Sequence, residues 1–341
     1  ERNRVVSVTV MAFAPGRVNL IGDHTDTTGG LVLPMAIDLG TTVTGVRAGD
    51  RVVLESETEP EPAVVALDVA DPAAVHPSWA RYVAGVVAQL RPAVGFDGRV
   101  TTSLPVGAGL SSSAALEVAV ALALGFDGPT VDLAQLTRRA EQQASGVPCG
   151  IMDQLASAAG VEGHALLIDC HEVTVAAVPV TDDVDVRVIH SGQARTLVGS
   201  AYAERTAALH EAESIVGPLR AIVDVGDLEP LRSIDRPGLL ARARHVVTEN
   251  ARVRAAGDAL RAGDARSFGQ LMVASHRSLR DDFEVSTEVL DALVDRLVAT
   301  PGVHGARLTG AGFGGCVVAL TDPGALDEGW LVRPSAGARL L

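Results

Sequence analysis

The sequence predicts an α+β protein of two lobes, with mixed strands and helices in residues 1–180 and mainly helices in residues 181–341. Three observations support this prediction. The chain has 341 residues, of which 47% are hydrophobic, and a single hydrophobic core stops growing near about 250–300 residues. Segments rich in β-branched residues dominate the first part of the chain, whereas amphipathic runs rich in arginine and alanine dominate the second. The turn-like segment TDDVD at 181–185 is the expected boundary between the lobes.

Four segments of the first hundred residues are predicted as strands, because they are β-branched and bounded by Gly, Asp or Pro. They are VVSVTVMAF at 5–13, TTVTGVRAG at 41–49, RVVLESE at 51–57 and RVTTSL at 99–104. The stretch DHTDTTGG at 23–30 is predicted as a loop. A helix begins near Ser111, and residues 113–124 are apolar nearly all round, which marks a buried helix. A second helix begins at Thr130, a favourable N-cap, and ends before Gly146.

Three more strand-like segments follow, and beyond about residue 195 the pattern becomes helical. The strands are HALLIDC at 164–170, EVTVAAV at 172–178 and DVRVIH at 185–190, and the helices cover 197–216, 238–262, 264–282 and 286–299. Two short strands, GARLT at 305–309 and CVVAL at 316–320, flank a glycine cluster near the end of the chain.

Charge and composition exclude several classes of protein. The net charge is −14, whereas a nucleic-acid-binding protein usually carries a basic face. No apolar run reaches the ~18–20 residues that span a membrane. The three cysteines, Cys149, Cys170 and Cys316, form no CxxC motif, so they predict a reducing cytosol and neither a disulfide framework nor a zinc site. We therefore expect a cytoplasmic protein without a nucleic-acid or membrane partner.

The sequence contains no lysine, and its 28 basic residues other than histidine are all arginines. This absence excludes a Walker A loop, a protein-kinase strand lysine and a pyridoxal phosphate Schiff base. If the protein handles ATP, local dipoles and arginines must meet its phosphates.

The segment LPVGAGLSSSAALE at 104–117 predicts a phosphate site. Its glycines allow the backbone to approach a ligand, and the N-terminus of the helix offers unpaired N–H groups and a positive dipole end. The serine hydroxyls add donors or a metal ligand. The alternative is a serine-capped helix after a tight turn, but three such features together favour phosphate binding.

The segment TGAGFGG at 309–315 matches the GxGxxG pattern of dinucleotide-binding proteins. That pattern requires a following helix and an acidic residue ~20 positions later. Here the strand-like CVVAL follows and the chain soon ends. We therefore reject dinucleotide binding and predict a glycine hairpin beside a neighbouring site.

The segment PCGIMDQLASAAG at 148–160 places Asp153 among apolar residues. A carboxylate there is costly unless it is paired. Arg17 is the candidate partner, and the pair could form the end of a site that carries the base, although a structural N-cap is an equal alternative. By themselves, Glu141 is an ordinary solvated helix carboxylate and His24 an ordinary structural histidine.

Together these segments resemble the galactokinase family, within the kinase superfamily named for galactose, homoserine, mevalonate and phosphomevalonate. The matching segments are GRVNLIGDHTDTTGGLVLPMAI at 16–37, GLSSSAALE at 109–117, CGIMDQ at 149–154, HALLIDC at 164–170, SHRSLRDDFEVS at 275–286 and TGAGFGGC at 309–316. The resemblance implies a ribosomal-protein-S5-domain-2-like β/α lobe, a ferredoxin-like C-terminal lobe and an active site between them.

The resemblance also implies a role for each matching residue. Asp153 would be the catalytic base at the sugar's anomeric hydroxyl, Arg17 would pair with it and steady the phosphoryl group, and Ser113 with Glu141 would hold Mg²⁺. The implied sugar contacts are Asp23, His24, Asp26, Gly150, Asp153 and Tyr202. The implied ATP contacts are Gly107, Ala108, Gly109, Leu110, Ser111, Ser112 and Ser113 at the phosphates and Trp79 near the adenine.

Two departures from the family signature concern the choice of sugar. Asp23 stands where the family has glutamate, and Thr27 and Thr28 stand where it has Tyr-Asn. The resemblance therefore implies an ATP- and Mg²⁺-dependent sugar 1-kinase that acts as a monomer, with galactose as the first choice of sugar. The alternatives are a kinase of another hexose or cyclitol, and a sugar- and ATP-binding sensor without catalysis.

Overall fold

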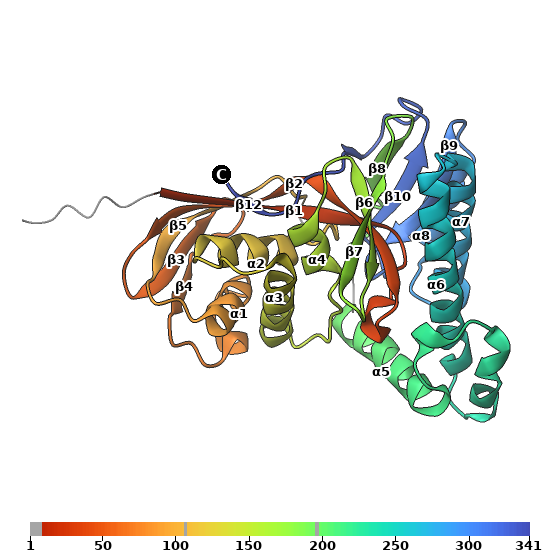
Figure 1. The fold of residues 1–341 in the computed structure, drawn as a ribbon, viewed down its shortest axis with the longest axis horizontal. Coiled ribbons are helices and arrows are strands. Elements are labelled where there is room, and N and C mark those ends of the chain that lie inside the picture. The colour runs from red at the N-terminus through yellow and green to blue at the C-terminus, as the bar shows by residue number, and fades with distance from the viewer. Residues whose placement is uncertain (1–8, 106–107, 195–197) are drawn as a thin grey trace, which may run out of the picture.

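The computed structural model describes residues 9–105, 108–194 and 198–341. In this part of the chain the strands form two sheets, one of eight strands and one of four. The sheets belong to two lobes that lie side by side along the longest axis of the molecule (Figure 1). The α+β fold in two lobes is therefore confirmed.

The larger sheet is built on a long antiparallel pair of strands, β1 and β2. Its order is β12 (Arg339–Leu340), β1 (Thr9–Ile21), β2 (Leu31–Arg47), β5 (Phe96–Thr102), β3 (Arg51–Ser56) and β4 (Ala63–Ala66), with β6 (His164–Asp169) beside the first residues of β2 and β7 (Thr174–Pro179) beside β6. Every pair in it is antiparallel except β3 with β5.

Both β1 and β2 are longer than the strands predicted for them. Pro15 and Pro34 are typical strand breakers, but register shifts between Pro15 and Arg17 and between Asn19 and Ile21 keep the strands paired. Residues 5–8 of the first predicted strand lie outside the described residues. Because β1 continues to Ile21, Arg17 lies within this strand, paired with Ala36 of β2, and the loop that follows begins at Gly22.

Three helices of the first lobe pack on this sheet, and a fourth packs on these three helices. The three are α1 (Ala80–Leu90), α2 (Ser112–Ala123) and α4 (Met152–Ala159), and the fourth is α3 (Thr130–Ser145). The nearly all-apolar α2 contacts β1, β2 and the other three helices, which explains its lack of a polar face. The helix α1 was not predicted, because its valines resemble a strand, yet Val83, Val86 and Val87 are buried at helical spacing. The helix α3 begins at Thr130 as predicted, but Pro129 is its N-cap residue and no side chain caps it.

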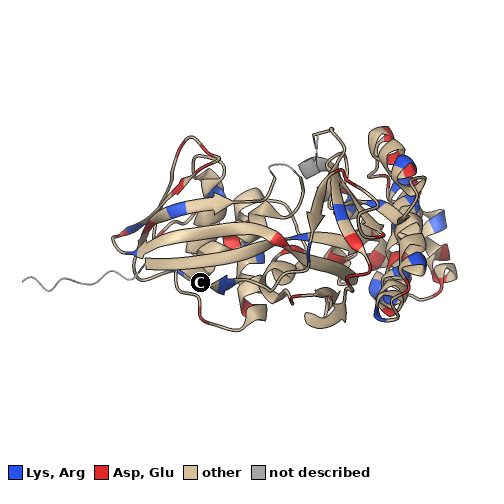
Figure 2. Ribbon diagram, turned by 90° about the horizontal axis from the view of Figure 1, so that it is seen from above, with Lys and Arg blue, Asp and Glu red and all other residues tan. Residues whose placement is uncertain are grey.

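The second lobe is a four-stranded antiparallel sheet covered by helices. The order of its strands is β11 (Trp330–Val332), β8 (Asp185–His190), β10 (Cys316–Thr321) and β9 (Val303–Thr309). Its helices are α5 (Val198–Val216), α6 (Leu239–Arg261), α7 (Ala265–Asp281) and α8 (Glu288–Val298). Both α7 and α8 pack on β9, and α6 packs on α7 and also reaches β1 and β2 of the first lobe. Acidic and basic residues are interspersed along these helices (Figure 2).

The two lobes share packing and chain connections. One hydrophobic cluster runs from β1 and β2 to Val253 on α6, Met272 on α7 and Val318 on β10. The end of the chain returns to the first lobe, where β12 pairs with β1. The two sheets support a boundary near residue 180, which stays a prediction. None of the helices described is long and apolar enough to cross a membrane.

Candidate active site

A cavity of about 680 Å³ lies at the junction of the lobes, within the ~300–1,000 Å³ of small-molecule sites. The first lobe supplies β1, the loop after it and the ends of α2, α3 and α4, and the second lobe supplies α5 and the β9–β10 turn. The cavity is lined by these predicted residues: Arg17, Asp23, His24, Asp26, Gly109, Ser111, Ser112, Ser113, Glu141, Gly150, Asp153 and Tyr202. Predicted residues up to 185 positions apart in the sequence, Arg17 and Tyr202, therefore meet in one site.

The remaining predicted residues lie elsewhere. Trp79 lines a second cavity of about 600 Å³ that shares Ser112 and Ser113 with the first. The indole N–H of Trp79 donates to the Glu61 carbonyl at 3.0 Å, so it is already engaged. The side chains of Ala108 and Leu110, two of the predicted phosphate contacts, are buried in the core. Gly107 lies outside the described residues.

Arg17 and Asp153 form the centre of the cavity. Arg17 Nε donates to Asp153 Oδ1 and Nη2 to Oδ2, both at 2.8 Å, while Nη1 donates to the Gly109 carbonyl at 2.8 Å. Ser111 Oγ donates to Asp153 Oδ2 at 2.5 Å. The Arg17 side chain is 5% exposed and that of Asp153 29%, so the carboxylate remains open to a ligand. Asp153 lies within α4, whose N-cap is Ile151, and the N-cap alternative is therefore wrong.

The N-terminus of α2 is left without a side-chain cap. Its N-cap residue, Ser111, has a left-handed backbone (φ 59°, ψ 48°), and its hydroxyl bonds to Asp153 instead of to the first turn of the helix. The backbone N–H groups of that turn, next to Ser112 and Ser113, are thus available to an anion. A Cβ at Gly16 would lie 2.6 Å from the Leu110 carbonyl oxygen, so glycine lets this segment approach β1.

A second carboxylate, Glu141 on α3, lies beside the start of α2. Ser113 Oγ donates to Glu141 Oε1 at 2.7 Å, and Gln154 Nε2 donates to Oε2. Burial and the Asp153 carboxylate raise the pKa of Glu141 to about 7, so it is not a solvated helix residue. Behind it, the pKa of the fully buried Glu117 is raised well above its usual range by burial and by Glu141. This corner of the cavity is rich in oxygen ligands.

His24 lies in the loop after β1 with a left-handed backbone (φ 66°). Its ring centroid lies 4.5 Å from that of Phe283 and 5.6 Å from that of Tyr202. Burial lowers the pKa of His24 to about 3, so the imidazole is neutral. Its Nε2 is buried and has no hydrogen-bond partner among the described residues. A buried polar atom in a cavity wall needs a partner, which a ligand hydroxyl can supply.

Asp26 lies against the backbone of Gly150. A Cβ at position 150 would lie 1.9 Å from Asp26 Oδ2, so only glycine leaves room for the carboxylate. Burial and the neighbouring carboxylates of Asp153 and Asp23 raise the pKa of Asp26 to about 7. The loop residue thus changes its charge near neutral pH.

Asp23 is 2% exposed, and its carboxylate already has protein partners. Oδ1 accepts from the Gly310 N–H at 3.1 Å, and Oδ2 pairs with Nη2 of Arg307, which is fully buried on β9. The TGAGFGG segment is a turn between the antiparallel strands β9 and β10, so the hairpin prediction is confirmed. Because both oxygens of Asp23 are engaged, its part in binding a sugar stays a prediction.

Sequence reasoning assigned no role to Glu117, Gln154 or Arg307. The signal that found Asp153, an ionisable residue in an apolar segment, was equally present for Glu117 in SAALEVAV and for Arg307 in GARLT. Cys149 and His190 also line the cavity. Burial raises the pKa of the Cys149 thiol, which therefore stays protonated at neutral pH.

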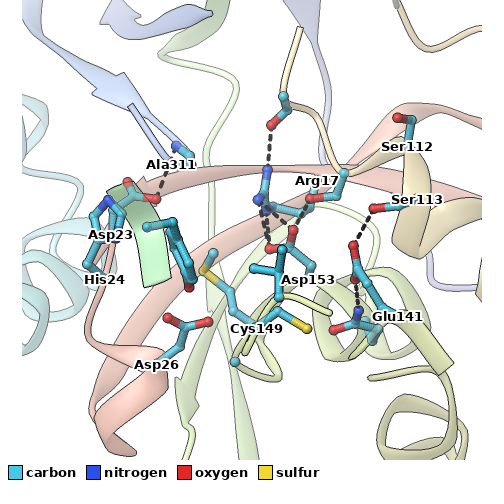
Figure 3. Close-up of a pocket in the computed structure, with 18 of the residues that line it drawn as sticks. Arg17, Asp23, His24, Asp26, Ser112, Ser113, Glu141, Cys149, Asp153 and Ala311 are labelled. Atoms are coloured by element: carbon cyan, nitrogen blue, oxygen red, sulfur yellow. Dashed lines mark hydrogen bonds and ion pairs between the residues drawn. The ribbon is translucent and has the colours of Figure 1, made fainter. Parts of the chain in front are cut away.

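The groups lie in a definite spatial order. Figure 3 shows Arg17 and Asp153 between two sets, with Asp23, His24 and Asp26 on one side and Ser113 and Glu141 on the other. A polyhydroxylated ligand among the first set could present a hydroxyl to Asp153, with a phosphate at α2 on the opposite side. Such positioning is what phosphoryl transfer chiefly requires.

Comparison with protein families gives three matches along the chain. The galactokinase galactose-binding signature matches residues 4–47, the N-terminal domain of GHMP kinases matches 81–161, and the C-terminal domain of GHMP kinases matches 258–331. These segments contain the loop after β1, the start of α2 with α3 and α4, and the β9–β10 turn.

Individual relatives match over nearly the whole chain. Human galactokinase is 45% identical over 92% of this chain and 83% of its own length. The galactokinase of Chloroflexus aggregans is 43% identical over 94% of this chain and 86% of its own. The crystal structure of Lactococcus lactis galactokinase complexed with galactose superposes with a TM-score of 0.88 at 34% identity, covering 98% of this chain and 95% of that one.

Proposed function

The chain belongs to the galactokinase family, and on that premise we propose how its residues carry out the reaction. The chain is an ATP-dependent kinase of galactose. We propose that the phosphoryl group goes to the anomeric hydroxyl. The observation that carries this proposal is the position of Asp153, held by Arg17 between the loop after β1 and the start of α2.

Galactose would lie against the loop after β1. The unpartnered Nε2 of the neutral His24 and the carboxylate of Asp26 offer hydrogen-bonding groups to its hydroxyls. Tyr202 and Gly150 line the same part of the cavity. Asp153 completes this set at the end nearest the phosphate, and Asp23 supports it through Arg307 and Gly310.

The transfer itself needs one proton acceptor and a stabilised phosphate. The anomeric oxygen forms the new bond to the γ-phosphorus, its proton goes to Asp153, and the bond from that phosphorus to the β-phosphate oxygen breaks to release ADP. Arg17 is bound to Asp153 through two atoms, so it fixes the carboxylate and contributes positive charge. The uncapped N–H groups of α2 hold the phosphates without a lysine.

Ser113 and Glu141 are proposed to hold Mg²⁺. Their hard oxygens fit this ion, which takes one or two protein ligands and keeps phosphate and water as the others. No cluster of three or more His, Cys, Asp and Glu side chains suited to a metal occurs in the described residues, so phosphate oxygens are needed. When bound, Mg²⁺ offsets the charge of the phosphates. The second cavity, with Trp79, would take the adenine beyond Ser112 and Ser113.

A monomeric state and a cytoplasmic location are two finer points of the proposal. The monomer rests on the family resemblance alone. Cys149 and Cys170 are free thiols, which supports a reducing compartment such as the cytoplasm.

A turnover assay tests the sugar. The purified protein is incubated with ATP, Mg²⁺ and galactose, other hexoses or cyclitols, and the position of the phosphate is read by phosphorus-31 NMR. Galactose 1-phosphate is the expected product. Faster turnover of another hexose or of a cyclitol would transfer the proposal to that substrate, and binding of sugar and ATP without turnover would identify a sensor.

The KM for galactose is expected to fall as the pH rises from 6 to 8. With the pKa of Asp26 raised to about 7, the carboxylate is mostly protonated at pH 6 and mostly ionised at pH 8. The ionised form accepts more hydrogen bonds from sugar hydroxyls, so the KM should fall by up to about tenfold over this range. The measurement is KM for galactose at saturating ATP and Mg²⁺, with Asp26→Asn as the control. A wild-type profile as flat as that of Asp26→Asn would contradict the assignment.

A further inference from the structure

The loop at residues 22–31, called here the sugar loop, joins two strands of the first lobe but is held by a helix of the second. The Gly22 N–H donates to Glu249 Oε1 at 3.0 Å, and the Leu31 N–H donates to Asn250 Oδ1 at 2.7 Å. Nε2 of His245 lies 3.1 Å from the Asp23 carbonyl oxygen. All three side chains belong to α6, so this helix bonds to the backbone at both ends of the loop.

Both carboxylate oxygens of Glu249 accept hydrogen bonds. Its side chain is 0% exposed, and each oxygen has partners. Besides Gly22, Oε1 accepts from Ser275 Oγ at 2.5 Å, and Oε2 accepts from Arg252 Nε at 2.6 Å. A buried carboxylate is tolerated only when it is paired and hydrogen-bonded in this way. Its bond to Gly22 joins a fixed charge of the second lobe to the backbone of the first.

Asn250 makes the matching contact at the other end. It is 2% exposed, and its Oδ1 also lies where any side chain at Gly30 would collide, because a Cβ there would be 2.7 Å away. The loop therefore lies directly against α6. The Asp23 carboxylate is held by Arg307 and Gly310, which also belong to the second lobe.

The residues that would act on phosphate have a different support. Arg17, Asp153, Ser113 and Glu141 all lie on elements of the first lobe and bond to one another there. The sugar loop also bonds to the first lobe, where the Cys170 N–H donates to the Gly30 carbonyl at 3.0 Å. Its two ends and the Asp23 carboxylate, in contrast, are held by α6, Arg307 and Gly310 of the second lobe. The placement of the sugar relative to the phosphoryl group thus depends on contacts between the lobes.

We propose that Glu249 and Asn250 are positioning residues for the sugar. They touch neither substrate, but they fix the backbone that carries Asp23, His24 and Asp26. This inference rests on the proposed function, in that the sugar is taken to bind at this loop. It requires that loss of either contact weakens sugar binding while the nucleotide side of the site stays intact.

The test uses Glu249→Ala and Asn250→Ala in the full chain. Each leaves a buried backbone N–H without its acceptor, so KM for galactose should rise roughly 5- to 100-fold, with KM for ATP within about twofold. Glu249→Gln keeps an oxygen for Gly22 and should restore KM for galactose to within about threefold of wild type. The matched control is Asp258→Ala, which removes an exposed carboxylate from the same helix.

A second readout does not need the sugar. Amide hydrogen exchange of the ligand-free protein should be faster at Gly22 in Glu249→Ala and at Leu31 in Asn250→Ala, with Asp258→Ala unchanged. The inference is overturned if exchange at both amides matches wild type, if galactose and ATP KM values rise together, or if Glu249→Gln behaves like Glu249→Ala. Failure of the proposed function is distinct, because the wild-type protein itself would then not phosphorylate galactose, and hydrogen exchange would still decide whether α6 holds the loop.

Discussion

Asp153→Asn is expected to lower kcat by about 10²- to 10⁴-fold, the usual contribution of a general acid–base group. Asparagine has nearly the same shape, but it cannot accept the proton of the attacking hydroxyl. Its amide nitrogen would also face either Arg17 or Ser111, both of which donate to the carboxylate in the wild type. Sugar binding should largely persist, because His24 and Asp26 contribute independently to that side of the cavity.

Two measurements on the same purified protein check this expectation. Steady-state kinetics give kcat, and calorimetry gives the galactose affinity without ATP. Asp281→Asn, which removes an exposed carboxylate on α7, is the control and should retain wild-type kcat. A kcat of Asp153→Asn close to wild type would remove Asp153 from the role of base, and a complete loss of galactose binding would make it a sugar ligand first.

The parts of the fold that the sequence predicted are those whose residues carry a local pattern. The apolar α2, the arginine- and alanine-rich α6 and the amphipathic α7 and α8 lie within a few residues of their predicted positions. Local pattern was ambiguous for the valine-rich α1 and misleading at Pro15 and Pro34, where bulges keep a strand paired. The return of β12 to β1 joins residues 328 positions apart, Ala12 and Leu340, and no local pattern encodes it.

The same distinction applies to the site. Asp153 could be found because a carboxylate in an apolar segment needs a partner, and Arg17 met that need from 136 residues away. The contact between Glu249 and Gly22 spans 227 residues and involves a backbone N–H, which leaves no trace in the composition of either segment. Family resemblance supplied the roles of individual residues, whereas the support of the sugar loop by α6 required the structure.

Glu141→Gln is expected to raise the Mg²⁺ requirement by about tenfold or more and to lower kcat. Glutamine keeps the size of the side chain and can keep the contact with Ser113, but it removes the negative charge from the oxygen pair offered to the ion. The loss should equal or exceed the ~10- to 100-fold that removal of residues supporting a metal ligand typically costs. Galactose affinity measured without ATP should change little, since Glu141 lies on the opposite side of Asp153 from His24 and Asp26.

In the wild type, the Mg²⁺ requirement should also depend on pH. Burial and Asp153 raise the pKa of Glu141 to about 7, so the carboxyl is largely protonated at pH 6 and ionised at pH 8. Only the ionised form attracts a divalent cation, so the Mg²⁺ concentration for half-maximal rate should fall as the pH rises through 7. In Glu141→Gln that concentration should stay high and nearly constant, because the neutral amide does not titrate.

Calorimetric titration of Mg²⁺ into protein with a non-hydrolysable ATP analogue checks the same shift without turnover. If the Mg²⁺ titrations of variant and wild type superimpose at both pH values, Glu141 is a buried helix carboxylate that only supports Ser113 and Gln154.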